Sequence, residues 1–375
     1  MQNQINLKYH LKIFNIFDLF KTSPMQKLIS FLLISVFLFS INVYESNAQN
    51  TSGLSINHQK IESHKTSIAT NYASSITTTD LEKHLYILAS DEFEGRKTGE
   101  AGQKKAAKYL VDYYKSINVS ATNEMNYLQN IPSNYFKGRS KNDSENVLAF
   151  IKGSEKPDEI IVISAHYDHV GTKDGEIYNG ADDDGSGTVA VLEIAQAFKI
   201  AKDRGNGPKR SILFLNLTGE EIGLMGAKYY AENPIFPLEN TVANLNIDMI
   251  GRVDEKYTDN PNYIYLIGAD KLSKELHQIS ENVNATYTNL ELDYTYNDES
   301  DPNRYYYRSD HYHFAKNNIP VIFYFNGVHE DYHQPTDTPD KINYKLLAKR
   351  AQLVFYTAWE LANRPERIKV DGKKN

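Results

Sequence analysis

The feature that most constrains the fold of this chain is an alternation between short apolar runs and longer amphipathic segments. The apolar runs are rich in β-branched residues and predict strands, whereas the amphipathic segments repeat apolar residues at helical spacing. The predicted strands are 146–151, 159–165, 211–217, 242–249, 262–267 and 320–325, and the helical patterns are 186–201, 270–284 and 343–364. Strands that alternate with helices predict an α/β fold in which helices sandwich a mainly parallel central β-sheet.

Segments outside this alternation also carry structural signals. Two helices are expected before the sheet: one opens with the capping-box pattern Thr79-Asp-Leu-Glu, and the other spans 102–117. Residues 286–308 are polar and rich in Tyr, Asp and Asn, which predicts a long loop near the strand ends. Loops of this length in compact domains tend to be functional.

The N-terminal region has the pattern of a secretory signal peptide. Lys27 precedes an apolar run over 28–43, and small residues suit a cleavage site after Ala48. We therefore assign 1–48 to a signal peptide, with Met25 as an alternative start. The run is shorter than the roughly 20 residues of a spanning helix, so no stable membrane insertion is expected after cleavage. The expected destination is the periplasm, the cell surface or the extracellular medium.

The remaining residues are expected to hold one folded domain. We predict a flexible segment over 49–76, a folded domain over 77–365 and a polar tail over 366–375. The net charge of -7 and the pI of about 5.9 indicate no basic face for nucleic acid. The absence of cysteine excludes a cysteine nucleophile, a thiolate zinc site and a lipid-modified cysteine. Nothing in the composition predicts a particular oligomeric state.

Two adjacent acids, Glu220 and Glu221, follow the predicted strand 211–217. Neighbouring side chains at a strand end diverge, so one carboxylate can bind a metal ion while the other acts on metal-bound water. In an open α/β sheet the functional crevice lies outside the carboxyl ends of the strands. Further metal ligands are therefore expected after other strands.

Two histidines meet that expectation. His166 follows strand 159–165, and Asp168 can accept its second ring N–H, which is the usual arrangement of a ligating histidine. His333 follows the last predicted strand, with Tyr332 before it and the carboxylate of Asp337 nearby. A histidine at a strand end also has a purely structural interpretation, which the neighbouring motifs weaken.

Acidic residues complete the set. The aspartates 182–184 stand between glycines before a predicted helix, where their repulsion requires solvent, the helix N-terminus or a cation. An N-capping acidic turn is the alternative to a metal site, whereas the flanking glycines allow close approach to an ion. Asp248 lies in an apolar run and would carry a heavy desolvation cost unless it were metal-bound or paired.

Together, two histidines and three carboxylates near different strand ends fit two divalent metals that share one bridging aspartate. Three carboxylates and one hydroxide would balance the charge of two dications. Nitrogen and oxygen ligands without sulfur favour two zinc ions, with Co²⁺ or Mn²⁺ as substitutes. Two ions about 3.5–4 Å apart would acidify a bridging water and polarise a carbonyl. The remaining glutamate would be the general base that passes the proton to the leaving amine.

These motifs resemble peptidase family M28, the co-catalytic zinc aminopeptidases. The resemblance covers about residues 80–362 and rests on Ala-His-Tyr-Asp-His (165–169), Gly-Ala-Asp-Asp-Asp-Gly-Ser-Gly (180–187), Thr-Gly-Glu-Glu-Ile-Gly-Leu-Met-Gly (218–226), Asn-Ile-Asp-Met-Ile-Gly-Arg (246–252), Arg-Ser-Asp-His (308–311) and Tyr-His-Gln-Pro-Thr-Asp-Thr (332–338). It implies a phosphorylase/hydrolase-like zinc exopeptidase fold.

The resemblance also implies a ligand set. His166 and Asp248 would bind one zinc ion, and Glu221 and His333 the other. Asp183 would bridge the ions, because the bridging acid of the family lies three residues before the Ser of the Ser-Gly pair.

Further roles follow from the same resemblance. Glu220 would be the general base, and Tyr332 matches a tyrosine that helps to stabilise the oxyanion in some members. Asp168 and Asp337 would support the ligands. The stretch 308–311 would support the pocket, with its arginine as an ion-pair partner or a substrate contact.

The sequence therefore predicts a secreted or periplasmic di-zinc exopeptidase that acts on peptides, above all an aminopeptidase. The main alternative is a glutaminyl cyclase, since the family contains such enzymes. They line their pocket with tryptophans, whereas the only tryptophan here, Trp359, lies in the C-terminal helical segment, which favours the peptidase. A dinuclear phosphoesterase, which the acids alone would permit, and a non-catalytic binding protein are weaker alternatives.

Overall fold

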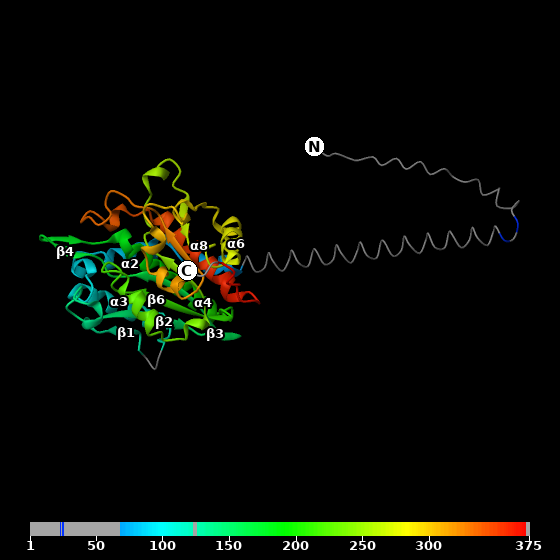
Figure 1. Cartoon of the computed structure of the whole chain (residues 1–375), viewed down its shortest axis with the longest axis horizontal. Coiled ribbons are helices and arrows are strands. Elements are labelled where there is room, and N and C mark those ends of the chain that lie inside the picture. Colours follow the sequence, from blue (N-terminus) through cyan, green and yellow to red (C-terminus); the bar gives the residue numbers. More distant parts are fainter. Residues whose placement is uncertain (1–22, 24, 26–67, 123–125, 373–375) are drawn as a thin grey trace. The chain divides into compact units, whose positions relative to one another are not determined.

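The computed structural model describes Ser23, Met25, residues 68–122 and residues 126–372 (Figure 1). The predicted signal peptide, apart from those two residues, and residues 49–67 lie outside the described part. The described residues from 68 onward belong to one compact unit, Ile68–Asn375. Across the described residues, no helix combines the length and the apolar character that are needed to cross a membrane.

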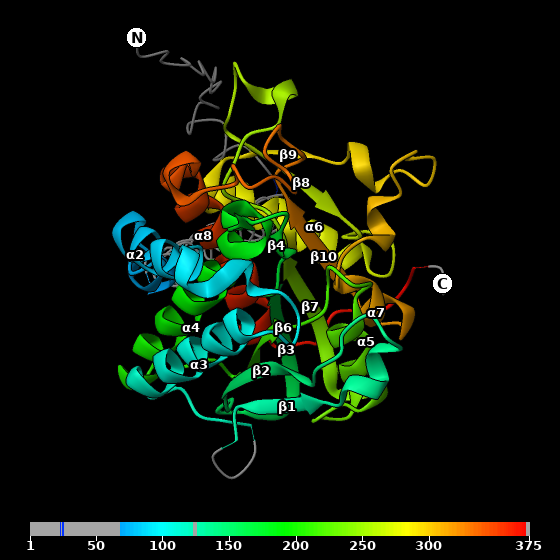
Figure 2. The ribbon, with the colours of Figure 1, turned by 90° about the vertical axis from the view of Figure 1, so that its left-hand side faces the viewer.

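An eight-stranded sheet forms the centre of this unit, in the order β1-β2-β6-β3-β7-β10-β8-β9 (Figure 2). Its strands are β1 (Leu128–Ile131), β2 (Ser144–Ile151), β3 (Lys156–His166), β6 (Arg210–Leu217), β7 (Thr241–Ile247), β8 (Tyr263–Ile267), β9 (Glu291–Asp293) and β10 (Val321–Phe325). The central strands β6, β3, β7 and β10 are parallel neighbours, whereas β2 and β8 run antiparallel to them. The predicted mainly parallel sheet is therefore confirmed. A separate hairpin joins β4 (Gly171–Lys173) and β5 (Glu176–Tyr178).

Helices cover both faces of the sheet (Figure 2). One face carries α2 (Thr78–Leu88), α3 (Ala101–Ser116), α4 (Gly187–Asp203), α6 (Lys274–Val283) and α8 (Tyr344–Asn363), and the other carries α5 (Met225–Glu232) and α7 (His311–Lys316). Successive residues of a strand point to opposite faces, so each central strand contributes to two cores. In β3, Ile161 and Ile163 belong to the first core and Val162 to the second.

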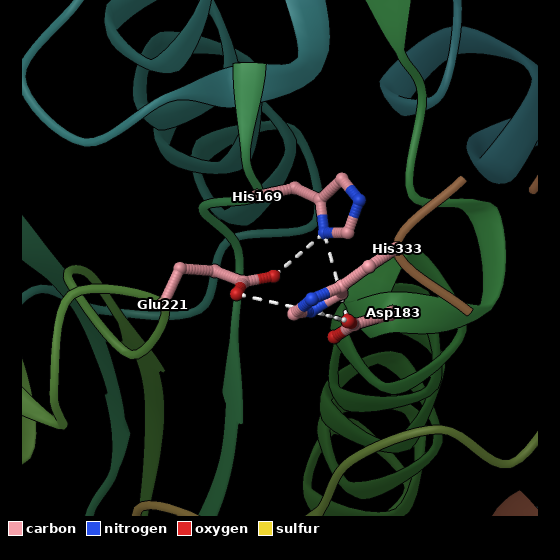
Figure 3. Close-up of side chains that lie close together, drawn as sticks. All are labelled: His169, Asp183, Glu221 and His333. Atoms are coloured by element: carbon pink, nitrogen blue, oxygen red, sulfur yellow. Dashed lines mark ion pairs between the residues drawn. The ribbon is translucent and has the colours of Figure 1, made fainter. Parts of the chain in front are cut away.

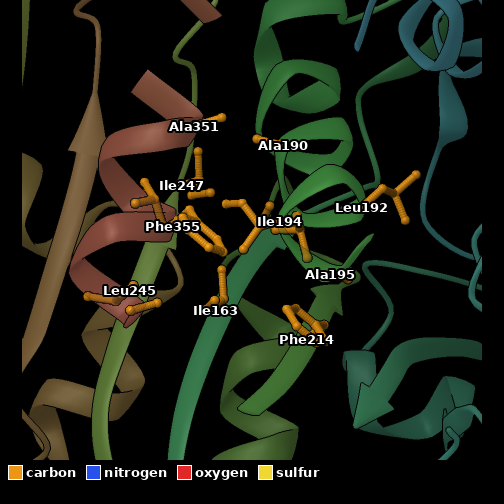
Figure 4. Close-up of a cluster of buried hydrophobic side chains, with 14 of the residues drawn as sticks. Ile163, Ala190, Leu192, Ile194, Ala195, Phe214, Leu245, Ile247, Ala351 and Phe355 are labelled. Carbon is orange, nitrogen blue, oxygen red and sulfur yellow. The ribbon is translucent and has the colours of Figure 1, made fainter. Parts of the chain in front are cut away.

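The larger core lies between α4, α8 and the central strands (Figure 4). Ile163, Ile194, Phe214, Leu245 and Phe355 meet there and are fully buried. Burial of an apolar side chain of this size stabilises the fold by about 1.5–3 kcal/mol. This packing fixes the central strands, and therefore their carboxyl ends, relative to the helices.

The N-terminal end of the unit corrects the predicted flexible segment 49–76. Residues 68–73 are helical. Buried side chains on this end are Ala69, Tyr72, Ala73 and Ile76. The ring centroid of Tyr72 lies 5.7 Å from that of Trp359 in α8. The compact unit therefore includes residues 68–76, ahead of the predicted start at residue 77.

The C-terminal residues also pack against the domain. Ile368 is buried, and the backbone N–H of Lys369 donates to the carboxylate of Glu275 at 2.9 Å. The N–H of Asp371 donates to the carbonyl of Leu272 at 3.1 Å. The described part of the predicted tail therefore lies against the start of α6.

Most predicted elements are present, with their ends displaced by a few residues. The first helix begins earlier than expected, because Thr77 rather than Thr79 is its N-cap and accepts from the N–H of Asp80. The predicted loop 286–308 contains the short strand β9 and two single 3₁₀ turns. Strands of three or four residues, such as β1, β4, β5 and β9, carry too little periodicity to be recognised from the sequence.

Candidate metal centre

The four central parallel strands bring the predicted site residues to one edge of the sheet. His166 is the last residue of β3, and Asp248 directly follows β7. Glu221 follows β6 after a short turn, and His333 lies in the segment after β10. Asp183 comes from the helical turn η4 (Ala181–Ser186), which leads into α4. Because the carboxyl ends of parallel strands meet at one edge, residues far apart in the chain form one cluster.

His166, Asp183 and Asp248 form the first ligand group, and all three are buried. Nε2 of His166 lies 3.2 Å from Oδ1 of Asp183 and 3.6 Å from Oδ1 of Asp248. The other oxygen of Asp248 accepts a hydrogen bond from the hydroxyl of Ser309 at 2.6 Å. This bond orients the Asp248 carboxylate and places Ser309, in the stretch 308–311, beside the first ligand group.

The second ring nitrogen of His166 has a different partner from the predicted one. Nδ1 donates to the backbone carbonyl of Asp168 at 3.0 Å, because a carbonyl can only accept. The carboxylate of Asp168 lies 3.7 Å away; it accepts instead from the Thr98 hydroxyl at 2.7 Å and from the backbone N–H of Glu220 at 3.2 Å. With the proton on Nδ1, the Nε2 lone pair of His166 is available to a metal.

The second ligand group contains His169, Asp183, Glu221 and His333 (Figure 3). Nε2 of His333 lies 2.9 Å from Oδ2 of Asp183 and 3.1 Å from Oε2 of Glu221. Nδ1 of His169 lies 2.8 Å from Oε1 of Glu221. Within this group, the nearest ligand atoms all lie within 4.8 Å of one another. His169 was not among the predicted ligands.

Asp183 belongs to both groups and turns a different oxygen to each. Its Oδ1 is the oxygen near His166, and its Oδ2 is the oxygen near His333. A carboxylate that presents one oxygen to each of two ligand groups has the arrangement of a bridging ligand. The bridging role of Asp183 stays a prediction, which this geometry would permit.

Buried atoms without partners indicate that this cluster fits a metal. Nε2 of His166, Oε1 of Glu221 and both ring nitrogens of His169 make no hydrogen bond with the described residues. Buried polar atoms are nearly always satisfied, so several such atoms in one place require an explanation. A donor set of imidazole nitrogens and carboxylate oxygens without sulfur is one that zinc accepts.

The protonation of the cluster reflects close packing of acids and imidazoles. Although burial lowers the pKa of His166, the carboxylates of Asp248 and Glu220 raise it well above its ordinary value. Burial also opposes the shift of His333, whose pKa rises to about 10 beside Asp183 and Glu221. The pKa of Asp183 falls well below its usual range, because the imidazoles of His166, His333 and His169 outweigh its burial. The carboxylates of the cluster therefore favour the positively charged form of the His166 and His333 imidazoles.

The adjacent acids Glu220 and Glu221 differ in environment. Burial, reinforced by Asp248 and Glu221, raises the pKa of Glu220 well above its ordinary value. The pKa of Glu221 is lowered, because His169 and His333 outweigh its burial and the charge of Asp183. Glu221 lies among the imidazoles, whereas Glu220 approaches only His166, with Oε2 4.0 Å from Nε2. The structure therefore separates the two side chains as expected from a strand end.

A cavity beside the cluster has both polar and apolar walls. It is lined by Asp183, Glu220, Asp248, Met249, Tyr305, Arg308, Phe323, Phe325, Val328 and Tyr332. The Tyr332 ring stacks on that of His333 with a centroid distance of 4.0 Å. Burial and the charges of Asp183 and Glu221 raise the pKa of the Tyr332 hydroxyl, which is therefore a neutral donor. The Arg308 guanidinium lies 4.8 Å from the centre of the Tyr305 ring.

The remaining acids hold the turn that carries Asp183. Asp337 accepts from the backbone N–H of Asp183 at 3.1 Å, so it supports that residue rather than the imidazole of His333. Asp182 accepts from the N–H of Gly251 at 2.7 Å. Asp184 accepts from the N–H of Met249 at 3.0 Å and from that of Gly187, at the start of α4, at 2.9 Å. Asp184 thus accepts from a backbone N–H at the start of α4, although the N-cap residue of that helix is Ser186, which makes no side-chain capping bond.

Arg96 is a supporting residue that the sequence did not reveal, whereas Asp310 lies in the stretch 308–311 that was expected to support the pocket. The Arg96 guanidinium is buried and donates to the carbonyls of Tyr167, Asn179 and Gly180 at 2.7–2.9 Å, which joins the segments that carry His166 and Asp183. Asp310 is fully buried, and neither carboxylate oxygen makes a hydrogen bond with the described residues. Arg96 stands in no sequence pattern that distinguishes it from an ordinary surface charge.

The model of peptidase family M28 matches residues 146–358, more than half of the chain, and includes every predicted ligand. The chain belongs to this family. Among curated relatives, a protein named "Probable leucine aminopeptidase" from Arthroderma otae is 31% identical over 225 residues, which are 58% of this chain and 57% of that protein. The chain spans about half to two thirds of the length of such relatives, which include proteins named "Probable zinc metalloprotease".

Solved structures show the same fold. The LapA aminopeptidase of Legionella pneumophila aligns with a TM-score of 0.62 and 21% identity, over 80% of this chain and 74% of that one. A glutaminyl cyclase of Porphyromonas gingivalis aligns with a TM-score of 0.58 and 19% identity, over 75% of this chain and 97% of that one. Both likenesses support the predicted α/β fold of this M28 protein.

Proposed function

We propose that this M28 protein is an exported di-zinc aminopeptidase that removes N-terminal residues from peptides. The observation that carries the proposal is the position of Asp183, which presents one oxygen to each of two ligand groups while Glu220 lies beside them in the same cavity. One group would hold a zinc ion through His166 and Asp248, and the other through Glu221 and His333. Bound zinc would supply the Lewis acidity that polarises a peptide carbonyl and acidifies water.

Glu220 is the group of this chain best placed to move protons. It lines the cavity and stays outside both ligand groups. The backbone N–H of Glu220 is held by Asp168, which fixes the start of its side chain. The carboxylate would accept a proton from the attacking water and return it to the leaving amine, as a general base and then a general acid.

Tyr332 is the proposed hydrogen-bond donor to the oxyanion. It lines the cavity, its hydroxyl is neutral, and its ring is held against His333. Donors placed where negative charge develops stabilise the transition state of acyl transfer. Tyr332 would therefore act on the reacting carbonyl from the side of the second ligand group.

Several observations favour a free peptide N-terminus as the group that the cavity binds. Of the three carboxylates that line the cavity, Asp183 and Asp248 would be committed to the zinc ions, which leaves Glu220 to face an ammonium group. Its apolar wall, formed by Phe323, Phe325 and Val328, would contact the side chain of the terminal residue. The name of the relative in Arthroderma otae, a probable leucine aminopeptidase, agrees with cleavage from the N-terminus.

The glutaminyl cyclase alternative gains no support from the residues around the cavity. Trp359 is partly buried against the larger core, with its ring 5.8 Å from that of Phe198 and 5.6 Å from that of Phe355. Tyrosines and phenylalanines line the cavity instead. Export rests on the predicted signal peptide, whose removal before Gln49 is part of the proposal.

Product analysis tests the proposed activity. Purified protein is incubated with matched free and N-acetylated peptides and with a peptide that begins with glutamine, and zinc is measured on the same sample. We expect about two zinc ions per chain and stepwise release of N-terminal residues from the free peptides only. Release of C-terminal residues, or conversion of the glutamine peptide to a pyroglutamyl product without hydrolysis, would contradict the proposal.

A further inference from the structure

His169 is a buried imidazole at the candidate metal centre that the proposed mechanism does not use. It lies three residues after His166, and its backbone N–H donates to the carbonyl of Arg96 at 3.3 Å. The side chain is fully buried. A Cβ at position 180 would collide with the His169 ring, so Gly180 leaves the room that the ring fills. The imidazole ring is therefore held in one position by the residues packed around it.

The surroundings of this ring resemble those of a ligand. Nδ1 of His169 lies 2.8 Å from Oε1 of Glu221 and 3.7 Å from Oδ2 of Asp183. Despite the short separation, neither Nδ1 nor Oε1 makes a hydrogen bond with the described residues. Two polar atoms that are this close without pointing at each other can both point at a third atom.

The predicted ligand His166 shows the same signature on the other side of the cluster. Its Nε2 lies 3.2 Å from Oδ1 of Asp183, and it too makes no hydrogen bond with the described residues. The two nitrogens thus face the same bridging carboxylate from different sides. A hydrogen-bonded structural histidine would instead show at least one satisfied ring nitrogen, because buried polar atoms are rarely left without partners.

We propose that Nδ1 of His169 is a further protein ligand of the metal ion that Asp183, Glu221 and His333 hold. The inference rests on the proposed di-zinc centre and deepens it by making the two sites unequal. The second site would have two imidazoles and two carboxylates, whereas the first has one imidazole and two carboxylates. Four protein ligands fill the tetrahedral shell of zinc and three leave one position open, so the reacting water would be held at the three-ligand site instead of being shared by both ions as expected from the sequence.

Unequal sites have a measurable consequence. The ion in the four-ligand site should bind more tightly than the ion in the three-ligand site, so zinc should enter and leave the protein in two separate steps. Loss of a group that merely supports a ligand weakens zinc binding by about 10–100-fold, so loss of a ligand should weaken it by at least the upper end of that range. The open position would lie on the His166 side, next to Glu220.

The experiment counts imidazoles and measures both affinities. X-ray absorption at the zinc edge is recorded on the purified protein loaded with two zinc ions, and zinc affinity is measured in competition with a chromophoric chelator. Variants are His169→Phe, which keeps a ring without a donor, and His169→Gln, which keeps an N–H donor toward Glu221. His277→Ala in α6 is the matched control, because that histidine packs on Tyr294 rather than at the metal centre.

We expect three imidazoles per two zinc ions in the wild type and two in both His169 variants, with the tighter affinity weakened about 100-fold or more. The control should match the wild type. Two imidazoles per two zinc ions in the wild type, or tight binding retained in His169→Gln, would show that His169 only positions Glu221 and would overturn the inference. A wild type that binds fewer than two zinc ions would instead overturn the proposed di-zinc function. The wild-type spectrum decides the question even if a variant does not fold.

Discussion

The carboxylate of Asp337 accepts a hydrogen bond from the backbone N–H of Asp183 at 3.1 Å. It also accepts from the N–H of Asp182, at 3.0 Å to Oδ2. These bonds hold the turn from which the Asp183 carboxylate projects between the two ligand groups. Asp337 is thus the support of the predicted bridging ligand, although it stands close to His333 in the sequence.

We expect Asp337→Ala to weaken zinc binding by about 10–100-fold, since groups that support a metal ligand typically contribute that much. Competition with a chelator measures the change. Asp340→Ala is the matched control, because this exposed acid lies three residues further along the chain. An unchanged zinc affinity in a folded Asp337→Ala variant would mean that Asp183 keeps its position without these bonds.

Glu220→Gln should separate chemistry from metal binding. The substitution keeps the size of the side chain but removes its capacity to accept a proton, so turnover should fall by about 10²–10⁴-fold. Zinc content should stay near two per chain, which elemental analysis of the same sample measures. Glu330→Gln, an exposed neighbour of the site, serves as the control. Substantial residual peptidase activity would remove Glu220 from its role as base.

Asp183→Ala should remove both metals, because this side chain faces both ligand groups. The measurement is zinc content after dialysis, together with the melting temperature of the variant. An inactive variant that still holds two zinc ions would show that another residue bridges them. A variant that keeps one zinc ion would show that one group is complete without Asp183.

Chelation should inactivate the wild type, and added zinc should restore activity. It should also lower stability, since a ligand that binds only the folded state at 100 times its dissociation constant stabilises that state by about 2.7 kcal/mol. Thermal unfolding with and without a chelator measures this difference. The Asp183→Ala variant should show no such shift, and a shift of equal size there would trace the effect to another site.

Phe214→Ala should test the packing that positions the strand ends. The side chain is fully buried in β6, and its ring lies 6.5 Å from that of Phe198 in α4. Its loss should lower the free energy of unfolding by about 3–5 kcal/mol, whereas Tyr86→Ala, at an exposed position, should change it by less than about 0.5 kcal/mol. Urea denaturation measures both. A small effect of Phe214→Ala would show that neighbouring side chains move to fill the space left by the Phe214 ring.

Much of the fold was predictable because its strands are buried. The central strands β3, β6, β7 and β10 have apolar runs that stand out in the sequence, and their parallel order follows from the helices between them. The start of the domain was missed although Ala69, Tyr72, Ala73 and Ile76 have helical spacing. The Ser and Thr residues around them obscured that pattern.

The candidate site was predictable to the extent that each ligand follows a strand. His169 was missed because its position depends on Gly180, which is near it only in the folded chain. The prediction that the Asp168 carboxylate accepts the second ring N–H of His166 was incorrect for a similar reason. The backbone bend after β3 brings the carbonyl of that residue, rather than its carboxylate, to the His166 ring, and no side-chain pattern encodes such a bend.

The contact between Tyr72 and Trp359 gives the protein a built-in optical reporter. Because Trp359 is the only tryptophan in the chain, excitation at wavelengths that spare tyrosine reports on a single position beside the larger core. That position touches the first helical turns of the domain and lies on the face of the sheet that carries α8. Its emission should therefore reveal when the N-terminal turns detach, and it should do so without any label and without disturbing the metal centre.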